Sequence, residues 1–262
     1  MENLLTDSPL FDQFPDIQYF FTTRKGGFSY GNYATFNLSP YVGDEPQCVA
    51  QNLNKLAETL SLPTHRIFFP HQNHGKFIHE IDETFLQLTP EEQKNRLAKV
   101  DGLYTNLKNV CISVTTADCV PLLFYDPVKK AVAVAHAGWR GTVQQIAAKM
   151  VATLVRKYGC SPKNIRVVMG PAISEQKYEV GKEILLTFII AGFETSEIFI
   201  QQENKIFLNL WKANEMILLG SGVLKSNIEI KELCTFTNSS DFFSARREGT
   251  YCGRMLNGII LR

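Results

Sequence analysis

The sequence predicts one domain of mixed α and β structure. Its 262 residues fit one large domain that can bury a hydrophobic core without disulfides or a structural metal. No internal repeat, low-complexity segment or Pro/Gly/Ser-rich linker divides the chain. Strand candidates outnumber helix candidates, and both types occur along the whole length. We therefore expect residues 1–262 to form a single α/β (mixed α+β) domain.

The helix candidates have apolar residues at a spacing of three to four, and they lie at 46–60, 142–158, 181–191 and 210–219. The helix at 142–158 carries the clearest signals, because Thr142 and Gln145 match a capping box and Gly159 stands where a helix would end. The polar stretch 82–99 predicts a loop with a short helix. Short apolar runs predict strands at 67–69, 77–81, 110–115, 121–125, 131–135, 165–169, 198–200, 206–208 and 258–261.

Two of these strands, 121–125 and 131–135, are joined by the polar segment PVKK, which predicts an antiparallel hairpin. Cys119 and His136 lie at its two open ends, so hairpin geometry brings them together. Taken singly, each residue is more often a buried small side chain or a satisfied polar group. Their joint position favours a metal site, since thiolate and imidazole are preferred zinc ligands and three protein ligands leave one position open for catalysis.

A third ligand must come from elsewhere in the chain. We expect His74, which is followed by Gly75 in a turn between two predicted strands. The competing candidates are His65, His71 and His79. Asp118 is expected to orient a ligating imidazole from behind.

The segment AGWRG, which follows His136, is expected to bind an anion. Its backbone N–H groups and the positive end of the helix predicted from Thr142 lie close to the metal candidate. We therefore assign Gly138, Arg140 and Gly141 to substrate binding, while a solvated Arg140 beside a core Trp139 is the plainer interpretation. Spacing alone assigns no function to Arg24, Arg254 or the pair 246–247. Binding of phosphate and simple solvation are the two interpretations of these arginines.

Charge and composition exclude several classes of protein. The 27 basic and 26 acidic side chains give a net charge of +1, too little to attract nucleic acid or anionic lipid over a whole face. The apolar run 184–193 is about half the roughly 20 residues of a membrane-spanning helix, and the N-terminus lacks the pattern of a signal peptide. Six cysteines without a Cys-x-x-Cys pair favour a reducing cytoplasm. We expect a cytoplasmic monomer or homodimer.

Several segments, taken in order, resemble one family. They are TTRKGG at 22–27, NL at 37–38, GD at 43–44, HG at 74–75, DGL at 101–103, TADCVP at 116–121, HAGWRG at 136–141 and GP at 170–171. They are similar to the YfiH/YlmD family, also called the laccase-domain or multicopper polyphenol oxidase family. The resemblance implies a layered α-β-β-α sandwich, a fold shared with toxin deamidases of the cytotoxic necrotizing factor type, and a metal held by His74, Cys119 and His136.

The resemblance also implies purine nucleoside chemistry. The family activities are phosphorolysis of adenosine, inosine, guanosine and methylthioadenosine, and deamination of adenosine to inosine, with zinc favoured and copper claimed. Arg24 corresponds to the arginine of the family's TTR segment, which implies a catalytic and substrate-binding role, and Asn37 is assigned to substrate binding on the same basis. The chain has CGR at 252–254 where TGR is expected, so Cys252 receives no role.

Four functions compete at this stage. Five histidines cannot supply the imidazoles of a multicopper oxidase beside a Cys/His site, whereas adenosine deamination needs one metal with an open position. Phosphorolysis needs positive groups for phosphate, for which Arg24 and the turn 138–142 are candidates. The third function is a hydrolase that cleaves amides or esters with a Cys119/His136 dyad. The fourth is a non-catalytic metal-binding partner of another enzyme. We rank the nucleoside enzyme first.

Overall fold

The computed structural model describes residues 4–262. Two sheets stack on one another, and a small antiparallel sheet lies beside them. The five-stranded sheet has the order β1 (Leu4–Leu5), β2 (Ile17–Thr22), β14 (Met255–Leu261), β6 (Cys111–Thr116), β3 (Ile67–Phe68). The six-stranded sheet has the order β13 (Ile228–Ile230), β9 (Arg166–Met169), β7 (Val120–Asp126), β8 (Ala131–Ala137), β5 (Gly102–Thr105), β4 (Ile78–Glu80). The small sheet contains β10 (Glu179–Val180), β12 (Lys205–Leu208) and β11 (Phe199–Gln202).

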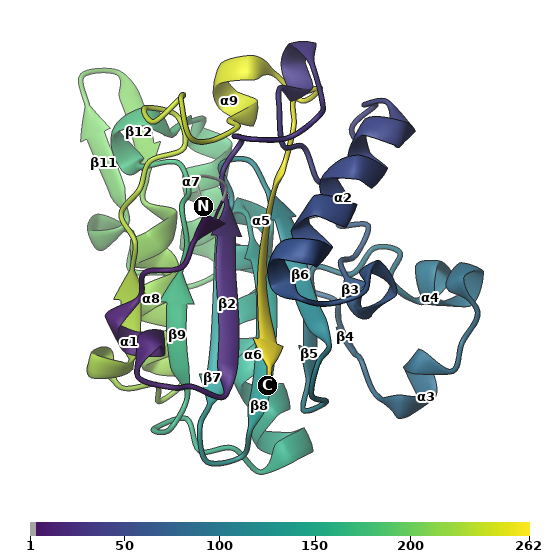
Figure 1. The fold of residues 1–262 in the computed structure, drawn as a ribbon. Helices are drawn as coiled ribbons and strands as arrows, with labels where there is room; N and C mark the ends of the chain where they lie inside the picture. Colours follow the sequence, from purple (N-terminus) through teal and green to yellow (C-terminus); the bar gives the residue numbers. More distant parts are fainter. Residues whose placement is uncertain (1–3) are drawn as a thin grey trace.

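Helices cover the outer face of each stacked sheet, as Figure 1 shows for α2 (Pro46–Leu60) beside β6 and β3. On β2, Phe20 points outward into a cluster with Leu56 of α2, while its neighbour Phe21 points inward to the core between the sheets, because successive side chains of a strand face opposite ways. On the far side, α6 (Ile146–Tyr158) and α8 (Leu210–Gly220) pack on the six-stranded sheet. The predicted α-β-β-α layering is confirmed.

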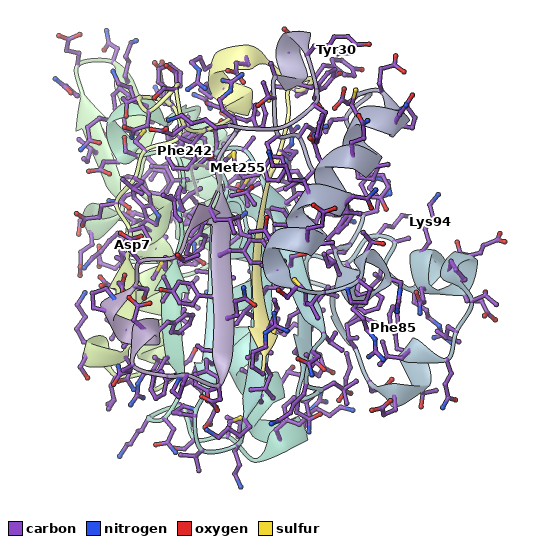
Figure 2. All side chains as sticks on the ribbon, viewed as in Figure 1. Asp7, Tyr30, Phe85, Lys94, Phe242 and Met255 are labelled. Carbon is purple, nitrogen blue, oxygen red and sulfur yellow. The ribbon has the colours of Figure 1, made fainter. Side chains whose placement is uncertain are left out.

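The remaining helices are short. The stretch 82–99, predicted as a loop with one short helix, contains two, α3 (Glu83–Leu86) and α4 (Pro90–Arg96), which are capped by the side chains of Asp82 and Thr89. Figure 2 shows Phe85 of α3 turned toward the body of the protein and Lys94 of α4 turned outward. The other short helices are α1 (Pro9–Asp12), α5 (Trp139–Val143), α7 (Lys182–Ile190) and α9 (Ala245–Glu248). There are 3-10 turns at Gly31–Tyr33, Thr64–Arg66, Glu175–Lys177, Thr195–Glu197 and Lys225–Asn227.

The helix prediction at 142–158 was wrong at its start. Gln145 adopts a left-handed backbone with φ of 62° and makes no side-chain cap, so it separates α5 from α6 and the capping box does not form. Gly159 ends α6 as expected, with φ of 67°. The helix at 46–60 and the β7–β8 hairpin are confirmed.

Five strands were missed, namely β1, β2, β5, β10 and β13. The longest of them, β2, is almost wholly buried on both faces, and such an apolar run lacks the alternation that distinguishes a strand from a buried helix. Within residues 4–262, no helix combines the length and the apolar character that crossing a membrane requires.

Candidate metal centre

The β7–β8 hairpin brings Cys119 and His136 to the same end of the two central strands of the six-stranded sheet. Cys119 immediately precedes β7, and His136 pairs with Pro121 near the open end of the ladder. Every residue of β7 and β8 is buried, so the two strands form a rigid base. This juxtaposition is the one that the sequence predicts.

His74 arrives from the loop between β3 and β4. Its backbone lies in the left-handed region with φ of 62°, a conformation that persists in a non-glycine residue only when its surroundings enforce it. Two anchors do so: the Gln72 side chain exchanges hydrogen bonds with the backbone of Thr115 on β6 at 2.8 Å, and the Asp101 carboxylate accepts the N–H groups of His74 at 3.0 Å and Gly75 at 2.8 Å.

The ligand atoms of His74, Cys119 and His136 all lie within 4.8 Å of one another. This spacing is close enough for the three side chains to share one ion, whose bonds to nitrogen and sulfur would be about 2.0 and 2.3 Å long. His136 is buried, Cys119 half-buried and His74 exposed, so the cluster is accessible from one side. In residues 4–262 this is the one such group of three or more His, Cys, Asp or Glu side chains.

The other histidines have different places. His71 stacks on Tyr41, with ring centroids 4.2 Å apart, and His79 packs edge-on against Phe85. His65 lies in a 3-10 turn. Among the residues that the structure describes, the cluster therefore takes its third member from His74.

Asp101, rather than Asp118, orients the buried imidazole. Its Oδ1 atom lies 2.8 Å from Nδ1 of His136, which leaves Nε2 to face the cluster, the usual arrangement behind a metal-bound histidine. The pKa of Asp101 is lowered: burial raises it, but the hydrogen bond to His136 and the backbone N–H groups outweigh burial. Because β5 pairs with β8, with Gly102 opposite Ala135, Asp101 comes to lie beside His136 although 35 positions separate them in sequence.

The prediction for Asp118 was wrong because both of its oxygens are already used. Oδ1 accepts from the Thr235 hydroxyl and Oδ2 from the backbone N–H of Arg246, each at 2.7 Å. Asp118 thus ties the residue before Cys119 to helix α9 instead of to an imidazole.

The charges of Cys119 and His136 are coupled. Burial raises the pKa of the Cys119 thiol, but the imidazoles of His136 and His74 outweigh burial and lower it to about 6. Burial likewise lowers the pKa of His136, while the Cys119 thiolate and the Asp101 carboxylate outweigh it and raise it to about 9. Without a metal, the pair therefore carries one shared proton at neutral pH, as thiolate and imidazolium.

Two glycines of the HAGWRG segment make room for the cluster. A Cβ on Gly138 would lie 2.8 Å from Sγ of Cys119, and one on Gly141 would lie 3.0 Å from the carbonyl oxygen of Gly75. Arg140 is exposed and its guanidinium lies 4.3 Å above the Trp139 ring. The segment opens the five-residue helix α5, and the long helix begins only at Ile146, so the predicted long-helix dipole does not point at the cluster.

A cavity of about 250 Å³ lies over the cluster. The stacked pair Tyr41 and His71 forms one wall, and residues 115–117 at the end of β6 form another. Its far side comes from the C-terminal part of the chain, through Ala245, Thr250 and Arg254. We call residues 242–254 the roof; Figure 1 shows its helix α9 beyond the ends of the strands.

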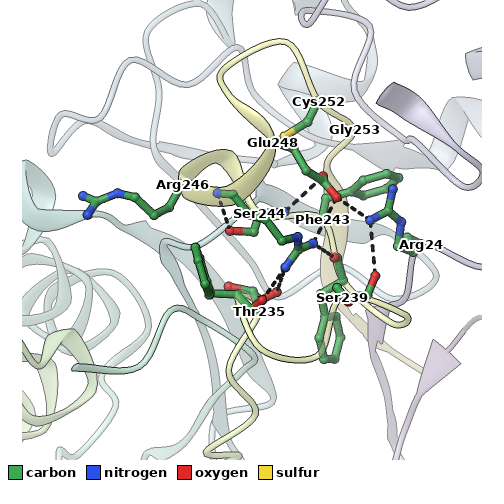
Figure 3. A network of polar contacts seen from close by, with 12 residues as sticks. Arg24, Thr235, Ser239, Phe243, Ser244, Arg246, Glu248, Cys252 and Gly253 are labelled. Carbon is green, nitrogen blue, oxygen red and sulfur yellow. Dashed lines mark hydrogen bonds and ion pairs between the residues drawn. The ribbon is translucent and has the colours of Figure 1, made fainter. Parts of the chain in front are cut away.

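Arg24 lies under the roof and is not among the described residues that line the cavity. Its Nη1 atom is 2.5 Å from Oε1 of Glu248, and its guanidinium lies 4.6 Å above the Phe243 ring. Figure 3 draws the contact between Arg24 and Glu248 as a dashed line. Arg247 braces the same segment by donating to the carbonyl oxygens of residues 235, 236 and 242. No local sequence pattern predicts the Arg24–Glu248 pair, because the two residues are 224 positions apart.

Asn37 is fully buried. Its Oδ1 atom accepts the backbone N–H groups of Arg254 at 2.9 Å and Ser39 at 3.1 Å, and its amide nitrogen donates to Asp44 at 2.9 Å. Asn37 therefore reaches the cavity through Ser39 and Arg254, both of which line it.

Comparison with known proteins shows to which family the chain belongs. Residues 18–262 match the family described as multi-copper polyphenol oxidoreductase laccase. The chain belongs to this family. A relative from Bacteroides thetaiotaomicron, named purine nucleoside phosphorylase, is 38% identical over 250 residues, which cover 95% of this chain and 93% of the relative. Another, adenosine deaminase RL5 from an unknown prokaryotic organism, is 37% identical over 245 residues, covering 93% of both chains.

Solved structures of YfiH and YlmD proteins have the same fold as this laccase-family chain. The Bacillus licheniformis protein YfiH superposes with a TM-score of 0.92 at 33% identity, covering 100% of this chain and 97% of its own. YlmD from Geobacillus stearothermophilus gives a TM-score of 0.90 at 33% identity, covering 99% and 96%. The recognition made from the sequence motifs is confirmed.

The laccase name does not match the ligands that this chain offers. A multicopper oxidase needs an electron-transfer copper and a trinuclear cluster, held largely by imidazoles. Of five histidines, two belong to the cluster, and His71 and His79 pack against aromatic rings. The described residues thus offer one candidate site for a metal ion, whereas a multicopper oxidase needs sites for four.

Proposed function

We propose that this chain is a zinc-dependent purine nucleoside phosphorylase that also deaminates adenosine. The single observation that carries the proposal is one accessible His74/Cys119/His136 cluster beneath a cavity. Relatives named for these two activities match more than nine-tenths of the chain. Adenosine, inosine, guanosine and methylthioadenosine are the proposed nucleosides, with phosphate as the second substrate.

The residues fit zinc. One thiolate and two imidazoles are typical zinc ligands, and a set of three leaves a position for substrate or water. Zinc bound there would act as a Lewis acid toward a ligand in the open position. The same donors also accept copper, so copper is the second choice.

The protein's own groups prepare that position. Asp101 keeps the His136 proton on Nδ1 and so turns Nε2 toward the cluster. The Tyr41–His71 pair presents a flat wall beside the ligands, on which a purine ring can stack.

The substrate-binding assignments of Arg24, Asn37, Gly138, Arg140 and Gly141 are part of this proposal. Gly138 and Gly141 contribute by letting neighbouring groups approach closely. Arg140 contributes its exposed positive charge to substrate binding. Arg24 contacts substrate directly only if its pair with Glu248 opens; otherwise it acts by holding the roof. Asn37 acts through the residues it positions.

One observation favours a cysteine hydrolase as the second candidate. The pKa of Cys119 is lowered by the neighbouring imidazoles, as expected for a nucleophilic thiolate beside a base. A dyad does not need His74, however, and His74 is held in a left-handed conformation that completes a ligand set. A non-catalytic metal protein ranks third, since structural zinc is normally closed by four ligands.

The test is a product assay on purified enzyme with adenosine, with and without phosphate, and with and without a zinc chelator. We expect adenine and ribose 1-phosphate only when phosphate is present, inosine without it, and neither product after chelation. Turnover of an amide or ester that survives chelation, with no nucleoside product, would establish the hydrolase instead.

Location and assembly complete the proposal. We propose a cytoplasmic enzyme acting as a monomer or homodimer, with residues 1–262 as one catalytic domain. All six cysteines are free, which is consistent with a reducing compartment.

A further inference from the structure

Arg254 brings an uncompensated positive charge to the cavity. Its Nη1 atom donates to the carbonyl oxygens of Cys252 at 2.6 Å and Gly253 at 3.1 Å and to Sγ of Cys252 at 3.1 Å, and Nη2 donates to the carbonyl oxygen of Thr250 at 2.9 Å. All these acceptors are uncharged groups at neutral pH, since burial raises the pKa of the Cys252 thiol. Within residues 4–262, no carboxylate forms an ion pair with Arg254.

The other arginines near the cluster are engaged differently. Arg24 is neutralised by Glu248, Arg140 lies over Trp139, and Arg246 lies over the Tyr178 ring. The described residues that line the cavity include no aspartate, glutamate or lysine. Arg254 is therefore the one permanently charged side chain in that lining.

The backbone of Arg254 is fixed before any ligand arrives. Its N–H group donates to Oδ1 of Asn37 at 2.9 Å, and its carbonyl oxygen accepts from the N–H of Leu38 at 3.2 Å. The preceding Gly253 packs so closely on the buried Phe243 ring that an added Cβ would lie 2.4 Å from it. A charge held in place in this way costs little reorganisation when an anion binds.

Two donors of the guanidinium are left over. The guanidinium group has five N–H bonds. The hydrogen bonds from Nη1 and from one Nη2–H hold the plane of the group in position. In the described chain, the Nε–H and the second Nη2–H have no acceptor. Donors on adjacent nitrogen atoms match two oxygens of one oxyanion, the bidentate geometry in which arginine surpasses lysine.

We propose that Arg254 binds inorganic phosphate, the second substrate of phosphorolysis; this inference rests on the proposed function. A phosphate oxygen forms a bond to the ribose C1′ atom as the C1′–N9 bond breaks. The purine leaves with the electron pair of that bond and takes up one proton, so no oxidant or reductant is required. In this arrangement Asn37 and Cys252 are positioning residues for Arg254.

The experiment uses zinc-loaded enzyme and compares wild type with Arg254→Gln, Arg254→Lys and the control Arg156→Gln, an exposed arginine of α6. Initial rates with inosine give separate KM values for nucleoside and phosphate, and adenosine deamination without phosphate serves as an internal reference. For Arg254→Gln we expect the phosphate KM to rise roughly 10- to 100-fold, the range for a lost charge-assisted contact. The nucleoside KM, the deamination rate and the zinc content should stay within about twofold of wild type, and Arg254→Lys should fall between the two.

An unchanged phosphate KM would overturn the assignment, and so would an equal loss of phosphorolysis, deamination and zinc, which would mean a structural role. Direct titration of inorganic phosphate onto the zinc-loaded protein separates this inference from the proposed function. Phosphate binding that depends on Arg254 in a protein without phosphorolysis would refute the function and keep the anion site. If Arg254→Gln weakens adenosine monophosphate but not inorganic phosphate, the site belongs to a nucleotide and the assignment fails.

Discussion

The metal centre and the roof are built in opposite ways. The centre rests on the ends of two fully buried strands and on Asp101, whose contacts fix both His136 and the His74 loop. The roof is a short helix and loops, held by polar contacts to distant parts of the chain such as Arg24 to Glu248 and Asn37 to Arg254. The candidate ligands are thus positioned by buried strands, whereas the roof residues that we propose to contact the substrate lie on loops and a short helix, the kind of segment that commonly carries binding residues.

The largest effect expected at the centre follows from removing its thiolate. Cys119→Ala should abolish zinc binding and reduce both nucleoside activities to background, because two imidazoles alone bind the ion weakly. The matched control is Cys48→Ala, another half-buried free cysteine, on α2. Zinc content by elemental analysis and product formation are the readouts. Full activity in a zinc-free Cys119→Ala protein would refute the mechanism.

Substitutions of Asp101 and Asp118 test the metal centre and the roof separately. Asp101→Asn should weaken zinc binding and activity by about 10- to 100-fold, the range for a partner of a metal-bound histidine. Asp118→Asn should leave zinc affinity within about threefold, because Asp118 contacts Thr235 and the Arg246 backbone, and should instead expose the roof to proteolysis. Competition with a chromogenic chelator measures the affinities. Equal zinc losses in both variants would erase the distinction between centre and roof.

The close approach at Gly138 gives a smaller, purely steric test. Its φ of −74° suits any residue, so Gly138→Ala adds only a Cβ placed 2.8 Å from Sγ of Cys119 and 3.3 Å from Cδ2 of His74. We expect zinc affinity to fall by roughly tenfold, about 1.4 kcal/mol. Gly220→Ala is the control, because nothing lies within 4 Å of its added Cβ. Unaltered zinc binding in Gly138→Ala would show that the cluster is looser than described.

The same contrast explains what the sequence could predict. The hairpin that unites Cys119 and His136 is a local pattern, so its residues predict the pairing directly. Asp118 was predicted in place of Asp101 as the carboxylate that orients His136. Asp101 lies beside His136 because β5 pairs with β8, and the sequence analysis did not predict β5. The strand β2 was missed because burial on both faces removes alternation. The placement of Arg254 at the cavity depends on Asn37, 217 positions away, which no local pattern encodes.

The smallest effect expected concerns Arg24. Its ion pair with Glu248 is about one-fifth exposed on both sides, so the pair adds at most about 1 kcal/mol of stability. If Arg24 acts by holding the roof, Arg24→Ala and Glu248→Ala should each lower phosphorolysis a few-fold, and the double variant should lose no more than either. A much larger loss in Arg24→Ala than in Glu248→Ala would establish the direct substrate contact predicted from the family resemblance.

The most direct test of the central claim is a zinc titration of metal-free enzyme, with phosphorolysis and deamination followed together. We expect both activities to be absent without zinc, to rise in parallel as zinc is added, and to level off at one equivalent per chain. Full activity before zinc is added, or a plateau that needs several equivalents, would contradict a single metal held by His74, Cys119 and His136.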